Sequence, residues 1–399
     1  MNILILNQSD KLVGGSDIYF RDLGDLLREK GHTVYEFYST SNVEYLDIYP
    51  LSINFDSPSA KDIVKYCYNK EAKDKLNNFI KNKKIDVAHL NIYYGKLTSS
   101  ILSVLVKNKI KIVQTLHEYK LVCPTYNMSC NGKFCEACKG NKFYNAILKK
   151  CNRGSFIRSI VSSVESYVSL ILGSQSKIDK FVCVSNFQKN KIIDMGIDSG
   201  KLTTVHNFLL SCKMNKNIIH DEGEFFLYLG RVEIEKGIVV FMEMAKRRPD
   251  LKFVVVGDGS YLSKALEKKE SEKIENISFV GKIDSNNVGE YLRKSIALVV
   301  PTLCMETFGL VILEAFNYSK PVVASRQGGM TEIVIDKDNG FLCDIGDVNS
   351  FLSAIDYLDR NRGLGKEMGE RGYYRMLDNF SEDCFYKKIV KIYEEVCYE

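Results

Sequence analysis

Two basic side chains stand near the ends of a short loop bounded by glycines. The loop is Gly230-Arg231-Val232-Glu233-Ile234-Glu235-Lys236-Gly237, and it follows an apolar run of strand type. Arg231 and Lys236 could clamp a pyrophosphate, because each hydrogen bond to a charged group contributes about 1.5–3 kcal/mol. Alternatively, Glu233 and Glu235 neutralise the two cations in ordinary surface ion pairs. The spacing alone does not separate these interpretations.

Two carboxylates lie eight residues apart around a second loop. Glu306 follows the apolar run 297–300, and Glu314 falls about two turns into a helix that we expect to begin near Thr307 or Phe308. The first backbone N–H groups of a helix have no partner within it, so they suit a phosphate or sugar oxygen. A carboxylate accepts two hydrogen bonds side by side, which suits the vicinal hydroxyls of a ribose at Glu314. A chance spacing is the alternative.

Five of the twelve cysteines fall between residues 123 and 151. Cys135 and Cys138 form a C-x-x-C pair, and Cys130 and Cys151 complete four thiols. Four thiolates suit tetrahedral zinc, which would hold together a loop that lacks a core of its own. The spacing is not one of the standard zinc signatures, so reduced thiols that only pack against their neighbours are the alternative.

The region around these cysteines is basic. Residues 107–158 contain eleven Lys and Arg against two acidic residues. The next segment, 155–172, carries a broad apolar stripe at helical spacing. We expect this helix to pack on its own domain. The alternative is contact with an anionic membrane surface or a lipid acceptor, because basic residues beside an apolar face suit lipid headgroups.

The elements that position these residues follow from strands that alternate with helices. Apolar runs of strand length occur at 2–7, 33–39, 87–91, 111–117 and 181–185, and again at 225–230, 252–256, 277–280, 297–300, 321–324 and 341–343. Most of them lead into helical patterns, which predicts parallel sheets covered on both faces. The fold class is therefore α/β, with two doubly wound Rossmann-like domains. Ligands of such sheets bind at the loops beyond the carboxyl ends of the strands.

The length of 399 residues fits two such domains. We expect an N-terminal domain over 1–208 with a cysteine-rich basic loop at about 120–155, a linker over 209–224, a second domain over 225–381, and a helix over 382–399 that crosses back to the first. No apolar run reaches the ~20 residues of a membrane span. The opening apolar run is too short for a signal peptide, so the expected location is the cytoplasm.

The charge is divided unevenly between the halves. Residues 1–210 carry 29 Lys and Arg against 19 Asp and Glu, and the remainder carries 26 against 31. The first half therefore suits an anionic partner, either a nucleic acid or a lipid surface, unless the excess lysines only solvate the protein. No zinc-finger, helix-turn-helix or aromatic-basic RNA motif supports nucleic acid.

Together, these motifs resemble a known family, the retaining glycosyltransferases of family 4, which have the GT-B fold of two domains facing each other across a cleft. The likeness covers essentially the whole chain and is densest between 225 and 345. It rests on the Arg231/Lys236 loop, on the Glu306/Glu314 pair and on three further segments. These are Val256-Gly257-Asp258-Gly259, Pro321-Val322-Val323-Ala324 with Gly328-Gly329-x-x-Glu332, and Asn339-Gly340-Phe341. Ser319 departs from the family, which usually has glycine before Lys-Pro.

The resemblance implies roles for individual residues. Arg231 and Lys236 would hold the donor diphosphate, Glu314 the ribose and Glu306 the transferred sugar. His117, in Thr115-Leu116-His117-Glu118-Tyr119, would contact that sugar near its reacting carbon. The remaining donor-site residues implied in this way are the Phe308-Gly309-Leu310 backbone and the glycine loop Gly14-Gly15.

The activity implied is the transfer of a hexose, with retention of configuration, from a UDP- or GDP-sugar to a glycan or lipid-linked acceptor. Many relatives build bacterial surface polysaccharide on lipid-linked acceptors, so the implied place of the reaction is the inner face of the cytoplasmic membrane. The departing phosphate would take the acceptor proton. Arg231, Lys236 and the helix N-terminus would stabilise the leaving diphosphate, so no divalent metal is needed and zinc would be structural only. The main alternative is a GT-B nucleotide-sugar 2-epimerase. A dinucleotide oxidoreductase is disfavoured, because Leu262 replaces the third glycine of its motif.

Overall fold

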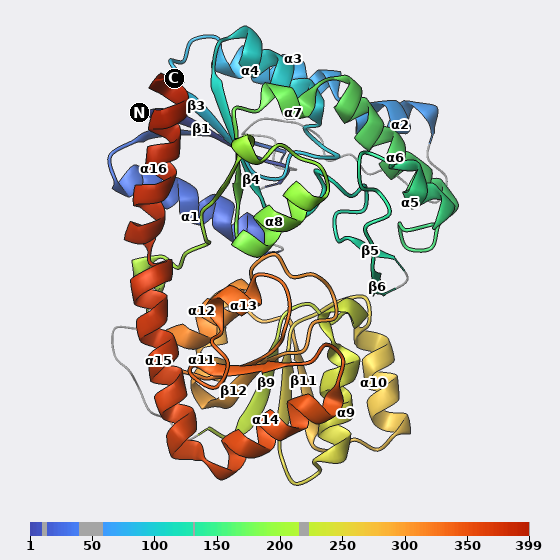
Figure 1. Ribbon diagram of the computed structural model, residues 1–399, viewed down its shortest axis with the longest axis vertical. Helices are drawn as coiled ribbons and strands as arrows, with labels where there is room; N and C mark the ends of the chain where they lie inside the picture. The colour runs from blue at the N-terminus through green and yellow to red at the C-terminus, as the bar shows by residue number, and fades with distance from the viewer. Residues whose placement is uncertain (10–13, 40–58, 131, 215–222, 399) are drawn as a thin grey trace. The chain divides into compact units, whose positions relative to one another are not determined.

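The computed structural model describes residues 1–9, 14–39, 59–130, 132–214 and 223–398. The chain divides into two compact units, one comprising Met1–His206 with Phe385–Glu399 and the other Asn207–Cys384. Each unit is built around one six-stranded sheet (Figure 1). The predicted α/β class with two doubly wound units is therefore confirmed.

The first sheet is entirely parallel, in the order β2-β1-β3-β4-β7-β8. Its four inner strands are buried along most of their length, as expected for a sheet covered on both faces, whereas the two edge strands are only partly buried. The strands are β1 (Asn2–Asn7), β2 (Thr33–Tyr38), β3 (Val87–Leu90), β4 (Lys111–Leu116), β7 (Lys180–Cys183) and β8 (Leu202–Thr204). The sequence patterns missed β8, a three-residue edge strand too short to show periodicity. They also missed a small antiparallel hairpin, β5 (Ser129–Cys130) with β6 (Lys133–Phe134).

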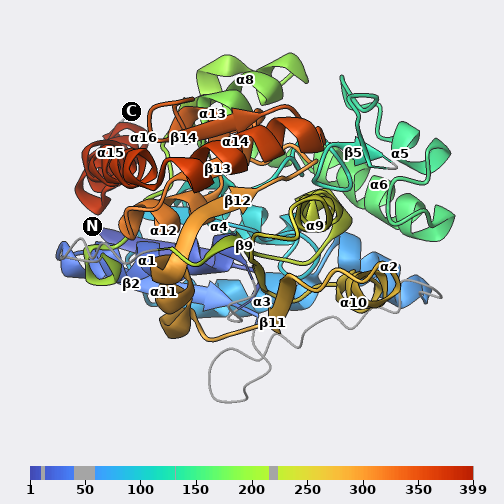
Figure 2. The ribbon, with the colours of Figure 1, turned by 90° about the horizontal axis from the view of Figure 1, so that it is seen from below.

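The helices of the first unit follow its strands in the sequence. They are α1 (Gly15–Glu29), α2 (Ala60–Cys67), α3 (Lys70–Ile80), η1 (Ser99–Ile101), α4 (Leu102–Lys107), α5 (Tyr144–Leu148), α6 (Phe156–Ile171), α7 (Ser174–Lys177), α8 (Asn186–Asp194) and η2 (Ser199–Lys201). Helices α5 and α6 lie side by side in both views of the ribbon (Figures 1 and 2).

The last helix, α16 (Glu382–Tyr398), joins the first unit from Phe385 onward. Its Tyr393 is buried and its hydroxyl bonds Nδ1 of His89 on β3. Tyr386 bonds Nε2 of His32 at 2.8 Å. These side-chain bonds, together with the buried face of α16, tie the end of the chain to the first sheet.

The second sheet is also parallel, in the order β11-β10-β9-β12-β13-β14. Its strands are β9 (Phe225–Leu229), β10 (Phe253–Val256), β11 (Ile277–Gly281), β12 (Ser295–Val300), β13 (Val322–Ser325) and β14 (Gly340–Cys343). Its helices are η3 (Ser211–Lys213), η4 (Ile234–Lys236), α9 (Ile238–Arg247), α10 (Leu262–Ser271), α11 (Ser285–Lys294), α12 (Leu310–Asn317), α13 (Met330–Ile333), α14 (Val348–Arg360) and α15 (Arg362–Phe380).

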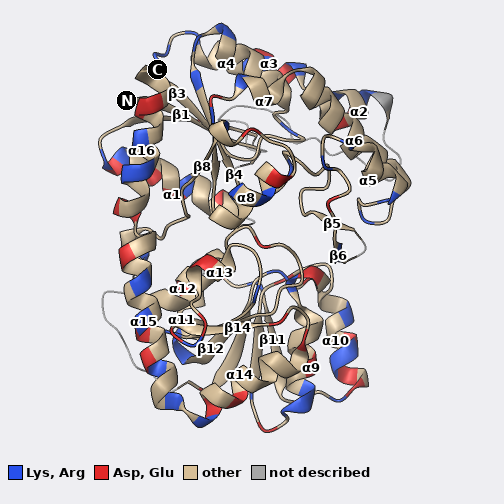
Figure 3. Cartoon of the chain, in the orientation of Figure 1, with Lys and Arg blue, Asp and Glu red and all other residues tan. Residues whose placement is uncertain are grey.

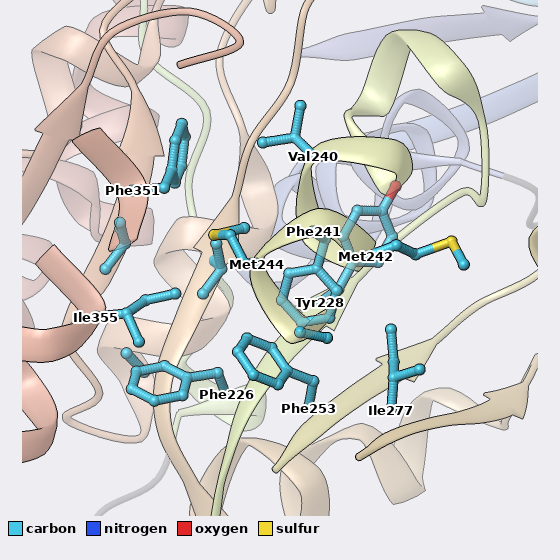
Figure 4. Packing of buried hydrophobic residues seen from close by; sticks show 14 of the residues in the cluster. Phe226, Tyr228, Val240, Phe241, Met242, Met244, Phe253, Ile277, Phe351 and Ile355 are labelled. Atoms are coloured by element: carbon cyan, nitrogen blue, oxygen red, sulfur yellow. The ribbon is translucent and has the colours of Figure 1, made fainter. Parts of the chain in front are cut away.

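The core of the second unit is aromatic where α9 packs on the sheet (Figure 4). Phe241 of α9 meets Phe253 edge to face, with ring centroids 5.4 Å apart, and lies 5.5 Å from Tyr228. Such pairs add about 0.5–1.5 kcal/mol to the burial of their area. This packing fixes the carboxyl end of β9, from which the Arg231/Lys236 loop departs.

No helix among the described residues is both long enough and apolar enough to cross a bilayer.

Candidate functional site

Two loops of the second unit are joined through one carbonyl oxygen. We call residues 230–237 the Lys236 loop and residues 301–309 the Glu306 loop. The carbonyl of Glu235 accepts hydrogen bonds from the backbone N–H of Leu303 at 2.8 Å, from that of Cys304 at 3.2 Å and from Oγ1 of Thr302 at 3.0 Å. The backbone beside Lys236 is therefore fixed against the loop that carries Glu306.

Gly237 brings the two loops closer than any other residue could. Its φ is +79°, and a Cβ placed on it would lie 1.8 Å from the carbonyl oxygen of Pro301. Glycine is therefore required at position 237 both by the close approach of Pro301 and by the left-handed backbone conformation.

Lys236 and Glu306 form an ion pair at this junction, Nζ to Oε2. Their side chains are 24% and 22% exposed, respectively. Burial by itself would lower the pKa of Lys236, but the Glu306 carboxylate outweighs it and holds that pKa above its usual value. The ammonium therefore stays charged at neutral pH, and it faces the carboxylate of Glu306.

The other end of the Glu306 loop is held by the turn after β13. The N–H of Gly329 donates to the carbonyl of Glu306 at 2.9 Å, and Nε2 of Gln327 donates to the carbonyl of Thr302 at 2.6 Å. A Cβ on Gly328 would lie 2.1 Å from the same Glu306 carbonyl. The segment Gly328-Gly329, which sequence comparison marked only as part of a motif, thus clamps the backbone of Glu306.

Helix α12 begins at Leu310, about two residues later than predicted. The reason is Gly309, whose φ of +105° is outside the helical range, and Phe308, which is buried against Phe380 at 5.8 Å between ring centroids. Glu314 lies half-buried on α12, next to the fully buried Leu313. The predicted donor residues Phe308, Gly309 and Leu310 therefore form the entry into this helix.

Arg231 is exposed and makes no ion pair with any described residue. The predicted alternative, pairing with Glu233 or Glu235, does not occur. Glu233 instead accepts hydrogen bonds from N–H and Oγ of Ser260, at 2.9 and 2.6 Å. Tyr228 fixes the backbone of the Lys236 loop, because its hydroxyl donates a hydrogen bond to the carbonyl of Arg231 at 2.6 Å. A solvent-facing guanidinium on a fixed backbone is available to an anion.

His117 lies in the first unit, directly after β4. Its Nε2 is 2.9 Å from Oδ1 of Asn91, and its ring meets Tyr19 edge to face at 4.7 Å. An amide oxygen only accepts, so the proton is assigned to Nε2. Burial lowers the pKa of His117 to about 3. The imidazole is therefore neutral at physiological pH and can hydrogen-bond a ligand, but it cannot serve as an imidazolium acid.

Gly14 and Gly15 lie where β1 gives way to α1. Gly14 is the N-cap of the helix, and its N–H donates to Oδ2 of Asp17 at 3.2 Å. A Cβ on Gly14 would meet nothing within 4 Å. Among the described residues, packing therefore does not require a glycine at this position. Residues 10–13 of the same loop lie outside the described part of the chain.

A buried ionic cluster that the sequence did not predict follows His117 in the chain. Lys120 and Glu165 form an ion pair at 2.6 Å with side chains only 6% and 2% exposed. Burial raises the pKa of the neighbouring Glu118 to about 7. The available signal was weak: a Glu118-Tyr119-Lys120 sequence next to the histidine, and one glutamate within an otherwise apolar and serine-rich helix.

The four cysteines proposed as zinc ligands are all free. Sγ of Cys130 is 3.7 Å from the carbonyl of Lys149, whose Nζ is 3.8 Å from Sγ of Cys135. Burial raises the pKa of both Cys138 and Cys151 to about 12. The thiol chemistry suits zinc, but in the described part of the chain no three such side chains are arranged to hold a metal. Zinc therefore stays a prediction, which metal analysis of the purified protein tests.

Two family models match the chain, one to each unit. Residues 13–209 match the model described as Glycosyltransferase Family 4, and residues 213–375 match the one described as Glycosyl transferases group 1.

Individual proteins agree with the family models. An uncharacterized glycosyltransferase of Methanocaldococcus jannaschii is 32% identical over 55% of this chain and 60% of its own length. An uncharacterized protein from the cps region of Klebsiella pneumoniae is 26% identical, over 91% and 96% of the two chains. N-acetyl-alpha-D-glucosaminyl L-malate synthase of Bacillus anthracis is 24% identical, over 97% and 94%.

Solved structures share the fold. Anabaena HepE, determined with UDP, superposes with a TM-score of 0.69 at 15% identity, over 99% of this chain and 100% of that one. Sucrose-phosphate synthase of Thermosynechococcus elongatus gives 0.76 at 18% identity, over 99% and 98%. At these identities the likeness extends to the fold alone.

Proposed function

This chain belongs to family 4 of the glycosyltransferases, and we propose that it transfers a hexose, with retention of configuration and without a catalytic metal, from a nucleoside-diphosphate sugar to a glycan or lipid-linked acceptor. The Lys236–Glu306 pair carries the proposal, because a backbone junction holds this ammonium and carboxylate together on loops that also present the exposed Arg231. Both family models and the Methanocaldococcus relative are described as glycosyltransferases, so the 2-epimerase alternative is not favoured.

The charges that bind the donor are those of the second unit. Arg231 and Lys236 hold the diphosphate, and Lys236 exchanges its contact with Glu306 for one with phosphate oxygen. Glu306 is then free to accept hydrogen bonds from the hydroxyls of the transferred sugar. Glu314 binds the ribose, and the backbone of Phe308–Leu310 supplies donors at the start of α12.

Catalysis in this proposal is electrostatic stabilisation of the leaving diphosphate. The bond from the anomeric carbon to the diphosphate breaks, the acceptor oxygen bonds to that carbon from the same face, and the acceptor proton passes to the departing phosphate. Neutral His117 contacts the sugar by hydrogen bonding, since its lowered pKa excludes an acid role at neutral pH. Gly14 and Gly15 border the donor through their backbone.

The acceptor is proposed to belong to cell-surface polysaccharide synthesis at the inner face of the cytoplasmic membrane. The support is the relative from a cps region, together with the basic first half of the chain. The donor is proposed to be a UDP- or GDP-sugar. HepE of Anabaena, which shares the fold, was solved with UDP and with UDP-glucose.

Calorimetry with UDP and GDP, with and without EDTA, tests the donor site. We expect one of them to bind unaffected by EDTA, and Glu314→Ala to weaken that binding. NMR of the product made from an α-linked donor tests retention, which predicts an α-linked product. Incubation with the donor alone tests the epimerase alternative, which predicts a changed sugar without any acceptor.

A further inference from the structure

Helix α6 is amphipathic with its polar side turned inward. The buried residues of α6 are almost all polar, and those most exposed on it are large and apolar. The buried ones are Ser159, Val161, Ser162, Ser163, Glu165 and Ser166, and the exposed apolar ones are Phe156, Ile157, Val164 and Ile171. A helix on the surface of a water-facing domain normally has the reverse arrangement.

The inward polar face is fixed by specific bonds. Glu165 forms the buried ion pair with Lys120 at 2.6 Å. Ser163 donates its hydroxyl to the carbonyl of Phe143 at 3.0 Å, and Nδ2 of Asn152 donates to Ser162 Oγ at 2.8 Å. Rotating the helix to hide its apolar side would break all three and leave buried charges unpaired. The apolar residues are therefore held on the outside.

The neighbouring helix α5 also carries exposed apolar side chains. Tyr144 and Leu148 are exposed there, Leu148 by 72%. On α6 the most exposed side chain is Ile171, at 82%. We call the six exposed apolar residues of α5 and α6 the α5–α6 face; they are Tyr144, Leu148, Phe156, Ile157, Val164 and Ile171.

The surroundings of the α5–α6 face are positively charged. Figure 3 shows α6 mostly in tan, with basic residues at the turn beyond α5. Between residues 133 and 172 there are seven Lys and Arg and two acidic residues. Glu165 is buried against Lys120, and Glu136 pairs with Lys191 at 2.7 Å. The exposed basic residues are Lys133, Lys139, Lys142, Lys149, Lys150 and Arg153.

We propose that the α5–α6 face docks on the surface of a bilayer containing anionic lipid, its apolar side chains entering the acyl boundary and its basic residues meeting the headgroups. Charge complementarity selects this occupant. A second copy of the chain would bring the same lysines against these lysines, which disfavours a self-complementary interface. The inference deepens the proposed function by naming the surface that would meet a lipid-linked acceptor, but its test does not depend on transfer activity.

Flotation of the full chain with lipid vesicles tests the docking. We expect it to float with vesicles of phosphatidylcholine and phosphatidylglycerol, and not with phosphatidylcholine alone. Ile157→Ser combined with Ile171→Ser should lower the partition coefficient at least tenfold. Lys149→Gln combined with Lys150→Gln should lower it about fivefold per lysine at low salt, and added salt should weaken binding by the full-length protein in the same way.

A matched control distinguishes binding through the α5–α6 face from nonspecific hydrophobic adsorption to the vesicles. Leu266→Ser combined with Ile345→Ser removes two other exposed apolar side chains, 41% and 51% exposed, elsewhere on the chain and should leave flotation unchanged. Binding to neutral vesicles equal to that on anionic ones, no flotation at all, or equal loss in the control would overturn the proposal. So would a dimer in solution that the Ile157/Ile171 variant dissociates while vesicles are not bound.

The same preparations are titrated with UDP and GDP. Nucleotide binding without flotation refutes the docking surface and leaves the donor site standing. Flotation without nucleotide binding refutes the donor site and leaves the docking surface standing. Loss of flotation in the Ile157/Ile171 variant supports docking only if nucleotide binding, and therefore the fold, is retained.

Discussion

Replacing Gly237 by alanine should destabilise the second unit more than the left-handed backbone alone explains. An alanine at φ +79° costs about 1–2 kcal/mol, less about 0.4–1 kcal/mol gained from a more restricted unfolded chain. Its Cβ would also lie 1.8 Å from the Pro301 carbonyl oxygen, whereas approaches below 3.0 Å essentially never occur. The two loops must separate, at about 1–3 kcal/mol for overpacking. These ranges sum to about 1–5 kcal/mol, with a midpoint of about 3 kcal/mol.

Gly346→Ala is the matched control. Its φ of +72° imposes a similar backbone cost, but its Cβ would make an ordinary contact with Leu303 at 3.5 Å. Its cost should therefore be about 1 kcal/mol or less. The difference between the two variants isolates the contact of Gly237 with Pro301.

Equilibrium urea unfolding followed by circular dichroism measures both costs, since the chain has no tryptophan to report by fluorescence. We also expect Gly237→Ala to weaken nucleotide binding under conditions where it is folded, because it moves Lys236 away from Glu306. Equal destabilisation by the two variants would refute the reasoning. It would mean that the two loops yield without cost and that their backbone junction does not position the ion pair.

Three further predictions concern charge. Lys236→Met should weaken nucleotide binding about 10–100-fold, while Glu306→Gln should preserve or tighten it and abolish transfer, as measured by calorimetry and a transfer assay. His117, neutral because its pKa is about 3, should give no inflection in the transfer rate between pH 5 and 8. Because the pKa of His117 in the unfolded chain is about 6.5, the stability that this residue contributes is present above that pH and is lost as the pH falls toward 3. Urea unfolding at pH 7 and at pH 5 should therefore show a smaller decrease in the free energy of unfolding for His117→Asn than for the unsubstituted protein. Lys120→Met should cost about 3–5 kcal/mol by leaving Glu165 buried and unpaired, and Lys120→Met combined with Glu165→Leu should cost less.

Local sequence patterns predicted most of the strands and helices. The apolar runs at 2–7 and 225–230 predicted the strands β1 and β9, because a parallel strand covered on both faces is apolar throughout. The same patterns failed where local cues are short or mixed. The edge strand β8 has three residues, and α12 begins two residues late because Gly309 adopts a left-handed backbone.

The site was only partly predictable. Sequence identified Arg231, Lys236 and Glu306 by residue type and resemblance, but it left the pairing of the cations open. The tertiary structure pairs Lys236 with Glu306, because the carbonyl of Glu235 gathers donors from residues nearly seventy positions away. Likewise, the clamp of Gly328 on the Glu306 backbone depends on an approach that spacing along the chain does not reveal.

In helix α6, the sequence predicts the helix itself, whereas tertiary packing decides which of its faces is buried. The spacing of its apolar residues predicts a helix with an apolar stripe, because residues at 3.6-residue spacing share a face. The expectation that this stripe packs on its own domain is wrong for Phe156, Ile157, Val164 and Ile171, which are exposed. Only the folded chain brings Lys120 to Glu165, and turning the other face of the helix inward would leave the buried Lys120 without its partner.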